Sequence, residues 1–296
     1  MRVVGVLIAV LLCGCTLRWQ AEPLPRPDGA SVFAVGDDVI HYRLVGPEGA
    51  PAVVLLHGFA SNLEIWGTVE PALADSTRVL SLDLKGFGQS SRYPGDYSRQ
   101  AQQDLVLALM DELGIERASL VAHSMGSAVA LGLAAQVPDR IERVALLGAW
   151  VFEEQVPWSF RDARQPGLGE GIFGIWFEEH LDLRMRYGFY DPDTHVTEAV
   201  LDHARAGLRR PGARAAALAT VRGLDLVGLE AELAAVHAPV RLIHGADDPV
   251  ARLAFAERLA ARLADTELFV VAECGHFPML EAPERTAHLV AELVSP

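Results

Sequence analysis

Residues 118–130 read ASLVAHSMGSAVA, and this stretch decides the fold. An apolar run ends at Ser124, and a pattern of small residues typical of a helix begins at once, which predicts a strand, one sharp turn and a helix. A serine at such a turn lies at the carboxyl end of a sheet. The N–H of the next residue, Met125, then lies at the start of a helix whose dipole favours negative charge. Ser124 is therefore a candidate nucleophile, although serine is also a good helix N-cap.

The composition limits the class of protein. The chain has 296 residues, of which 51% are hydrophobic and 22% charged. These values are typical of a globular protein large enough for one α/β domain that carries an insertion. The net charge is −14, and Lys85 is the only lysine. Because nucleic acids and acidic headgroups need a basic surface, we expect no nucleic-acid partner.

The N-terminus resembles a bacterial lipoprotein signal. Arg2 precedes an apolar run at 3–12 that is too short to span a bilayer as a mature helix. The sequence LCGC at 12–15 resembles the lipobox, in which cleavage before a cysteine accompanies its lipidation. This resemblance implies that the signal peptide, 1–14, is removed and that Cys15 is lipidated, which would anchor the protein firmly. The alternatives are an uncleaved N-terminal anchor and an ordinary signal peptide.

The expected location follows from this signal. A lipidated Cys15 implies the bacterial cell envelope, on the periplasmic side, and Thr16 at the next position slightly favours the outer membrane. Residues 15–29 contain three prolines and no hydrophobic period, so we expect a tether outside the fold. After cleavage and lipidation only Cys274 would remain as a free thiol, so a disulfide framework is not available.

Apolar runs and turn residues predict an alternation of strands and helices. Helices are expected over 97–113, after the serine turn, and at about 250–264 and 283–294. Strands that alternate with helices predict a mostly parallel, doubly wound sheet of the α/β class. The expected strands are 31–35, 38–45, 52–56, 78–82, 118–122, 141–147, 240–243 and 268–271.

One interval breaks this alternation. Residues 151–224 show several helical patterns and no clear strand, and they follow the strand at 141–147. They are therefore predicted to form a helical cap inserted between the two parts of the core, 30–150 and 225–296. Ten of the 21 aromatic residues fall in or beside the cap, which predicts a roof that excludes water and favours apolar groups. Any single ring more often serves packing. The ten are Trp150, Phe152, Trp158, Phe160, Phe173, Trp176, Phe177, Tyr187, Phe189 and Tyr190.

The sequence also offers partners for Ser124. A serine hydroxyl becomes nucleophilic when an imidazole accepts its proton and a carboxylate holds that imidazole in one tautomer. HGADDP at 244–249 follows one predicted strand and supplies Asp247 and Asp248, while ECGHFP at 273–278 follows the next and supplies His276. The order along the chain is Ser, Asp, His, as in hydrolases built on an α/β sheet. This reasoning leaves open which aspartate is used.

These segments resemble the α/β-hydrolase superfamily, in the branch with a His-Gly-Phe loop and a helical cap. The resemblance covers about 35–295 and includes HGF at 57–59, DLKGFGQS at 83–90 and HSMG at 123–126. It implies that Ser124 is the nucleophile, that His276 is the general base and acid, and that Asp248 rather than Asp247 is the acid of the triad, since Asp248 is third after Gly245. Asp247 could instead cap the following helix.

The same resemblance implies an oxyanion hole. Its two donors would be the backbone N–H groups of Phe59 and Met125. The chain departs from the Gly-x-Ser-x-Gly pattern at Ala122, and Ser127 replaces a frequent second glycine. An extra methyl group tightens the turn without forbidding it.

Several other polar residues have a structural interpretation. We expect His57 to brace its loop, His123 to pack beside the nucleophile and His244 to belong to the end of a strand. Cys274 is interpreted as a small buried hydrophobic residue, because no separate base is placed for it.

The residues and the resemblance together predict a serine hydrolase that cleaves a carboxylic ester of a small, largely apolar substrate through an acyl-enzyme on Ser124. This chemistry calls for no metal and no organic cofactor. Thioester, lactone and amide cleavage, hydrolysis of a carbon–carbon bond in a vinylogous diketone, and cofactor-free perhydrolysis use the same triad, and the fold alone does not separate them. A receptor that binds a small ligand without turnover is an alternative of another class.

Overall fold

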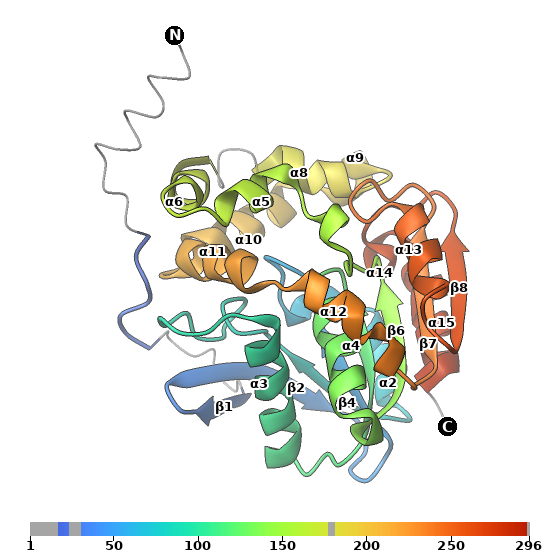
Figure 1. Ribbon diagram of the computed structural model, residues 1–296. Coiled ribbons are helices and arrows are strands. Elements are labelled where there is room, and N and C mark those ends of the chain that lie inside the picture. The colour runs from blue at the N-terminus through green and yellow to red at the C-terminus, as the bar shows by residue number, and fades with distance from the viewer. Residues whose placement is uncertain (1–16, 24–30, 177–180, 295–296) are drawn as a thin grey trace.

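A computed structural model describes residues 17–23, 31–176 and 181–294. Its centre is an eight-stranded sheet in the order β1-β2-β4-β3-β5-β6-β7-β8 (Figure 1). The pairs β1–β2 and β2–β4 are antiparallel and the others are parallel, so the prediction of a mostly parallel α/β sheet is confirmed. The strands are β1 (Ser31–Val35), β2 (Asp38–Val45), β3 (Ala52–Leu56), β4 (Arg78–Leu82), β5 (Ala118–His123), β6 (Ile141–Leu147), β7 (Val240–Gly245) and β8 (Thr266–Val271).

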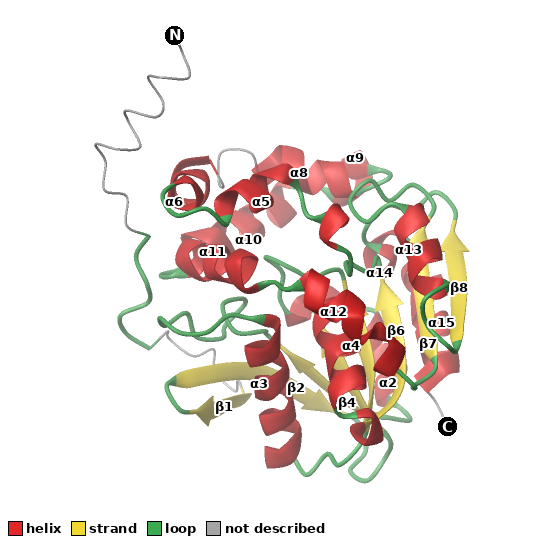
Figure 2. Ribbon diagram, viewed as in Figure 1, coloured by secondary structure: helices red, strands yellow, loops and turns green. Residues whose placement is uncertain are grey.

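Helices cover both faces of this sheet (Figure 2). Successive side chains of a strand point to opposite faces, so Val54 and Leu120 belong to one hydrophobic cluster with helices on one face, whereas Val53 and Val121 belong to another with helices on the opposite face. The helices of the core are η1 (Leu63–Trp66), α2 (Val69–Ala74), α3 (Arg99–Glu112), α4 (Gly126–Gln136), η2 (Pro138–Arg140), α12 (Leu226–Glu232), η5 (Leu233–Ala235), α13 (Leu253–Ala260), α14 (Pro278–Glu281) and α15 (Pro283–Val294).

Between residues 151 and 224 the described residues form helices and loops, and no strand. In Figure 1 these helices lie above the carboxyl ends of the parallel strands, which is the edge where Ser124 emerges. They are η3 (Glu153–Gln155), α5 (Trp158–Ala163), α6 (Leu168–Gly171), the π-helical turn η4 (Ile172–Trp176), α8 (Leu181–Gly188), α9 (Pro192–His195), α10 (Glu198–Arg209) and α11 (Ala213–Gly223). None of the described helices is long and apolar enough to cross a membrane.

The N-terminal segment differs from the prediction in part. Of the tether predicted over 15–29, residues 17–20 pack on the folded domain. The ring of Trp19 stacks on that of Tyr97 with centroids 5.6 Å apart. Buried Gln20 accepts a hydrogen bond from the Arg92 N–H at its side-chain oxygen (2.9 Å) and donates its own N–H to the Arg92 carbonyl (3.2 Å). Leu17 contacts a cluster of α5, α10 and α11. These partners are distant in sequence, so local composition does not show them. The predicted signal peptide and Cys15 lie outside the described residues.

Candidate active site

Ser124 lies on the sharp turn between β5 and α4, as the sequence predicts. Its φ is +51°, in the left-handed region that a residue with a side chain rarely adopts. The Ser124 N–H donates to the carbonyl of Leu147 in β6 (3.0 Å), which fixes the turn against the sheet. A Cβ on Gly126 would lie 2.5 Å from the carbonyl oxygens of Leu56 and His57, so this glycine lets α4 approach the loop after β3. Ala122, two residues before Ser124, is fully buried.

The structure brings Ser124, His276 and Asp248 together from three loops. His276 Nε2 lies 3.0 Å from Ser124 Oγ, and His276 Nδ1 lies 2.8 Å from Asp248 Oδ2. Because a carboxylate only accepts hydrogen bonds, Nδ1 carries the proton of a neutral ring, and Nε2 is then an acceptor for the serine hydroxyl. All three side chains are buried. This arrangement can remove a proton from Ser124 Oγ and return it to a leaving group.

Asp248 is held firmly in this position. Its Oδ1 accepts the backbone N–H groups of Val250 and Ala251, each at 2.8 Å. Burial alone would raise the pKa of Asp248, but the attraction to His276 in its protonated form and the hydrogen bond from His276 outweigh burial and lower the pKa below its ordinary value. The carboxylate is therefore ionised at neutral pH.

Asp247 has a different environment. Its side chain is exposed, and its backbone N–H donates to the carbonyl of Cys274 (3.0 Å). The idea that Asp247 caps the following helix is wrong, since α13 begins at Leu253 after Arg252, which makes no side-chain cap. Of the two aspartates, only Asp248 contacts His276.

The two candidate oxyanion donors flank Ser124. Met125 directly follows it and precedes the first turn of α4, where backbone N–H groups lack partners within the helix. Phe59 belongs to the loop after β3, whose backbone approaches the nucleophile closely. A Cβ on Gly58 would lie 2.9 Å from Ser124 Cβ.

The other histidines near the site have the structural contacts expected of them. His123 donates its Nε2–H to the carbonyl of His276 (2.9 Å), and burial, together with the adjacent His276, lowers the pKa of His123 to about 3. His244 is buried at the end of β7, and burial lowers its pKa as well. His57 accepts the Leu84 N–H at Nε2 (3.0 Å) and lies 2.7 Å from the Gly58 carbonyl at Nδ1.

Cys274 precedes His276 by two residues but is not equipped as a nucleophile. Its side chain is fully buried, and burial, reinforced by the negative charge of Glu281, raises the pKa of the thiol to about 12. A thiol with this pKa is protonated at neutral pH, and the thiolate is the reactive form.

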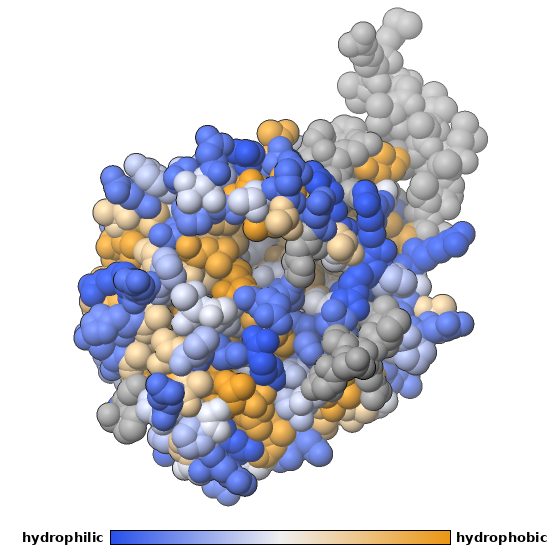
Figure 3. Space-filling model, turned by 180° about the vertical axis from the view of Figure 1, so that it is seen from behind, coloured by the Kyte–Doolittle hydropathy of each residue, from blue (hydrophilic) through white to orange (hydrophobic). Residues whose placement is uncertain are grey.

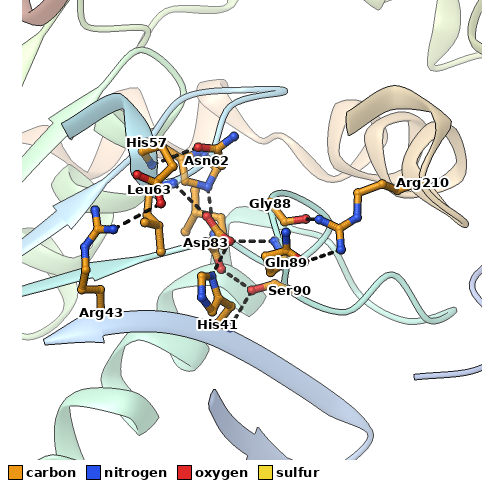
Figure 4. A network of polar contacts seen from close by, with 12 residues as sticks. His41, Arg43, His57, Asn62, Leu63, Asp83, Gly88, Gln89, Ser90 and Arg210 are labelled. Carbon is orange, nitrogen blue, oxygen red and sulfur yellow. Dashed lines mark hydrogen bonds and ion pairs between the residues drawn. The ribbon is translucent and has the colours of Figure 1, made fainter. Parts of the chain in front are cut away.

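Two carboxylates that organise the site were not assigned a role from the sequence. Glu281 Oε1 accepts the N–H groups of Gly275 (3.0 Å) and Phe277 (3.2 Å), on either side of His276. Asp83, at the end of β4, lies at the centre of the contacts in Figure 4. Asp83 begins the motif at 83–90, so the sequence contained a signal for it. Glu281 acts on a turn whose backbone direction the sequence does not specify, so no signal pointed to its role.

The ten aromatic residues predicted to form a roof lie in different environments. The ring of Phe160 on α5 lies 5.0 Å from that of Phe59, 5.8 Å from that of Phe173 and 6.2 Å from that of Trp150, which forms an aromatic cluster beside the candidate oxyanion loop. Trp158, Tyr187 and Tyr190 are instead exposed, so these three do not contribute to a closed roof. Phe177 and the side chain of Trp176 lie outside the description. The remaining two, Phe152 and Phe189, are buried.

Apolar and hydrophilic residues are mixed on the face of the protein that Figure 3 shows, where orange apolar residues alternate with blue hydrophilic ones. Among the described residues, no group of three His, Cys, Asp or Glu side chains could hold a metal ion.

Known proteins resemble the chain over most of its length. Residues 51–283 match the family described as alpha/beta hydrolase fold. The 2-hydroxymuconate semialdehyde hydrolase of Pseudomonas sp. (strain CF600) is 30% identical over 257 residues, or 82% of this chain and 86% of the relative. The pimeloyl-(acyl-carrier protein) methyl ester esterase of Aromatoleum aromaticum (strain DSM 19018 / LMG 30748 / EbN1) is 33% identical over 256 residues, or 82% of this chain and 98% of the relative.

A solved structure shows the same similarity. The 2-hydroxy-6-oxo-6-phenylhexa-2,4-dienoate hydrolase from Rhodococcus sp. strain RHA1 superposes with a TM-score of 0.77 at 26% identity, covering 89% of this chain and 97% of that one. These proteins are two hydrolases and an esterase by name, so a hydrolase activity is supported. The family match, the sheet topology and the serine turn agree, and the chain therefore belongs to the alpha/beta hydrolase family.

Proposed function

We propose that the protein is a serine hydrolase that cleaves a carboxylic ester through an acyl-enzyme on Ser124. The observation that carries this proposal is the chain of hydrogen bonds from Ser124 Oγ through His276 to Asp248. Ser124 Oγ attacks the acyl carbon while His276 Nε2 takes its proton, and the same nitrogen then gives that proton to the leaving alcohol. Water, deprotonated by His276, attacks the acyl-enzyme, and the proton returns to Ser124 as the carboxylic acid leaves.

Two hydrogen-bond donors are needed to stabilise the negatively charged oxygen of each tetrahedral intermediate. The backbone N–H groups of Phe59 and Met125 take this role in the proposal, and one such donor contributes about 3 to 4 kcal/mol where it has been measured in other enzymes. Ionised Asp248 stabilises the imidazolium that forms at His276 in the same step.

The residues around the candidate active site favour a substrate with an apolar acyl group. The aromatic cluster of Phe59, Phe160, Phe173 and Trp150 lies where residues 151–224, acting as a cap, meet the candidate oxyanion loop. Apolar walls exclude water and favour apolar substrate groups. Trp150 and Phe173 of this cluster are buried and support an apolar substrate. The exposed rings of the cap, which belong to Trp158, Tyr187 and Tyr190, do not add to this support.

Hydrolysis of a carbon–carbon bond is the second candidate, because two of the similar proteins are named as hydrolases of compounds without an ester bond, 2-hydroxymuconate semialdehyde and 2-hydroxy-6-oxo-6-phenylhexa-2,4-dienoate. The purified protein should turn over p-nitrophenyl esters of short and medium chain length steadily, with a kcat/KM above that for a vinylogous 1,5-diketone. Release of p-nitrophenol and loss of the diketone absorbance measure the two rates. A larger kcat/KM for the diketone would favour the second candidate.

The protein is further proposed to be lipid-anchored through Cys15 in the bacterial cell envelope. Leu17, two residues later, contacts α5, α10 and α11, so an acyl chain on Cys15 would hold this side of the protein close to the membrane. Radiolabelled palmitate is expected in the wild type and not in Cys15→Ser. Equal labelling of both proteins would contradict the anchor and leave the proposed chemistry untouched.

A further inference from the structure

We infer that Glu281 is a positioning residue that holds the backbone of His276 against the cap. The inference rests on the proposed function, since His276 is the general base in that proposal. Glu281 is the last residue of α14 and follows His276 by five residues. Its carboxylate accepts backbone N–H groups from the loop at 272–277, which carries His276, and from Tyr190 of the cap.

The contacts with the loop lie on both sides of His276. Glu281 Oε1 accepts the Gly275 N–H at 3.0 Å and the Phe277 N–H at 3.2 Å. The same loop contains Glu273, whose φ of +51° lies in the left-handed region. Such a conformation persists only where the surrounding structure holds it. Because the residues before and after His276 are bound to one carboxylate, the direction in which the His276 side chain leaves the backbone is fixed.

The cap is bound to the same loop. The Tyr190 N–H donates to Glu281 Oε2 at 2.7 Å, and the N–H of His276 itself donates to the carbonyl of Gly188 at 2.7 Å. The two backbones are in close contact here, since a Cβ on Gly275 would lie 2.5 Å from the Gly188 oxygen and 2.8 Å from the Tyr190 nitrogen. In Figure 1, α8 and α9 lie above α14. The segment that connects α8 to α9 therefore contacts the backbone of His276 directly.

Stacked rings extend this contact to the imidazole. The ring of Phe189, a buried residue between the two backbone contacts of the cap, stacks on the Phe277 ring with centroids 4.5 Å apart. The Phe277 ring in turn meets the His276 ring edge to face, with centroids 5.2 Å apart. Aromatic pairs at these distances attract each other. The cap thus contacts the backbone of His276 and, through Phe277, its side chain.

These contacts give the cap a second role, besides that of a wall of the substrate site. His276 Nε2 must lie near Ser124 Oγ while Nδ1 lies near Asp248 Oδ2, at the 3.0 Å and 2.8 Å of this structure. A displacement of about 1 Å in an active site can lower the rate about hundredfold. Hydrogen bonds from N–H groups to a carboxylate are stronger than those to a neutral acceptor, so Glu281 suits the task of joining the loop to the cap. Alignment of the triad then depends on the position of the cap.

Two substitutions separate the contacts of Glu281. In Glu281→Gln the amide oxygen can still accept the N–H groups of Gly275 and Phe277, but the NH2 group then faces the Tyr190 N–H, and two donors cannot bind each other. Glu281→Ala loses all three contacts. With p-nitrophenyl esters, we expect kcat to fall about tenfold in Glu281→Gln and about hundredfold in Glu281→Ala, with KM within about twofold of the wild type.

Glu284→Gln is the matched control, because it makes the same change of charge at an exposed position three residues later. Its kcat should stay within about twofold of the wild type. If Glu281 served only the shape of the substrate site, Glu281→Gln would raise KM and leave kcat unchanged, and this result would overturn the inference. Wild-type kcat and KM in Glu281→Gln would overturn it as well, since the contact with the cap would then not matter.

A small fluorophosphonate supplies a second readout. It reacts with Ser124 only when His276 removes the serine proton, and an ethyl group needs little of the substrate site. Its rate constant should fall by the same factors as kcat in the two Glu281 variants, and an unchanged rate constant in both would refute the inference. These results are distinct from failure of the proposed function, in which wild-type turnover would not depend on Ser124.

The wild type gives a test that does not depend on folding of a variant. The N–H groups of Tyr190, Gly275, His276 and Phe277 lie outside helices and strands, yet each has the acceptor described above. Hydrogen exchange followed by NMR should show these four amides exchanging at least about a hundredfold more slowly than in an unfolded peptide. Exchange of the Tyr190 amide at the rate of an unfolded peptide would refute the inference, even if both Glu281 variants fail to fold.

Discussion

Substituting Ser124 with alanine is expected to lower kcat for p-nitrophenyl ester hydrolysis by about 10⁴-fold to 10⁶-fold, as loss of the nucleophile does in other serine hydrolases. The hydroxyl that lies 3.0 Å from His276 Nε2 is removed, so no acyl-enzyme can form. The contacts that bind substrate remain, so KM should change little. Initial rates and mass spectrometry of the protein after mixing with substrate measure both effects, and only the wild type should gain the mass of an acyl group.

The neighbouring Ser127 provides a matched control. It is also a buried serine and is the second residue of α4. Its Oγ has no hydrogen-bond partner among the described residues. Ser127→Ala should therefore keep kcat within about threefold of the wild type, as expected for removal of a group without a defined contact. Comparable activity of Ser124→Ala and wild type would contradict the proposed mechanism.

The sequence alone was sufficient to predict the sheet that carries the candidate active site. Apolar runs bounded by turn residues predicted all eight strands, because each buried strand must be apolar and each connection must turn. The turn at Ser124 was predictable for the same reason. The positive φ at this residue goes with a turn of only two residues, Ser124 and Met125, between the strand and the helix.

Other features depend on contacts that no local pattern shows. Gln20 is buried against Arg92, and its surroundings in the sequence are typical of a tether. Asp83 links residues from three separate segments, His41, Leu63 and Gln89, and its importance appears only when they meet. In the same way, two adjacent aspartates satisfied the triad order equally, and only the path of the loop after β7 shows that Asp248 is the one in contact with His276.

The contact between Asp248 and His276 leads to the second prediction with a large effect. Asp248→Asn is expected to lower kcat by about 10³-fold to 10⁴-fold, because an asparagine amide can donate to His276 Nδ1 and so favours the ring tautomer with its proton on Nε2, facing Ser124. The substituted ring can then no longer accept the proton of the serine hydroxyl. The variant also loses the negative charge that stabilises the imidazolium. The N–H groups of Val250 and Ala251 can still donate to the amide oxygen, so the loop should keep its conformation.

Asp247→Asn is the matched control, since it makes the same change of charge at the adjacent, exposed position. Its carboxylate does not contact His276, so kcat should stay within about twofold of the wild type, as for most exposed substitutions. Thermal unfolding of both variants separates loss of function from loss of structure. If Asp247→Asn lost activity and Asp248→Asn kept it, the acid of the triad would be Asp247, and the 2.8 Å contact between Asp248 Oδ2 and His276 Nδ1 would not be the one that holds the imidazole during catalysis.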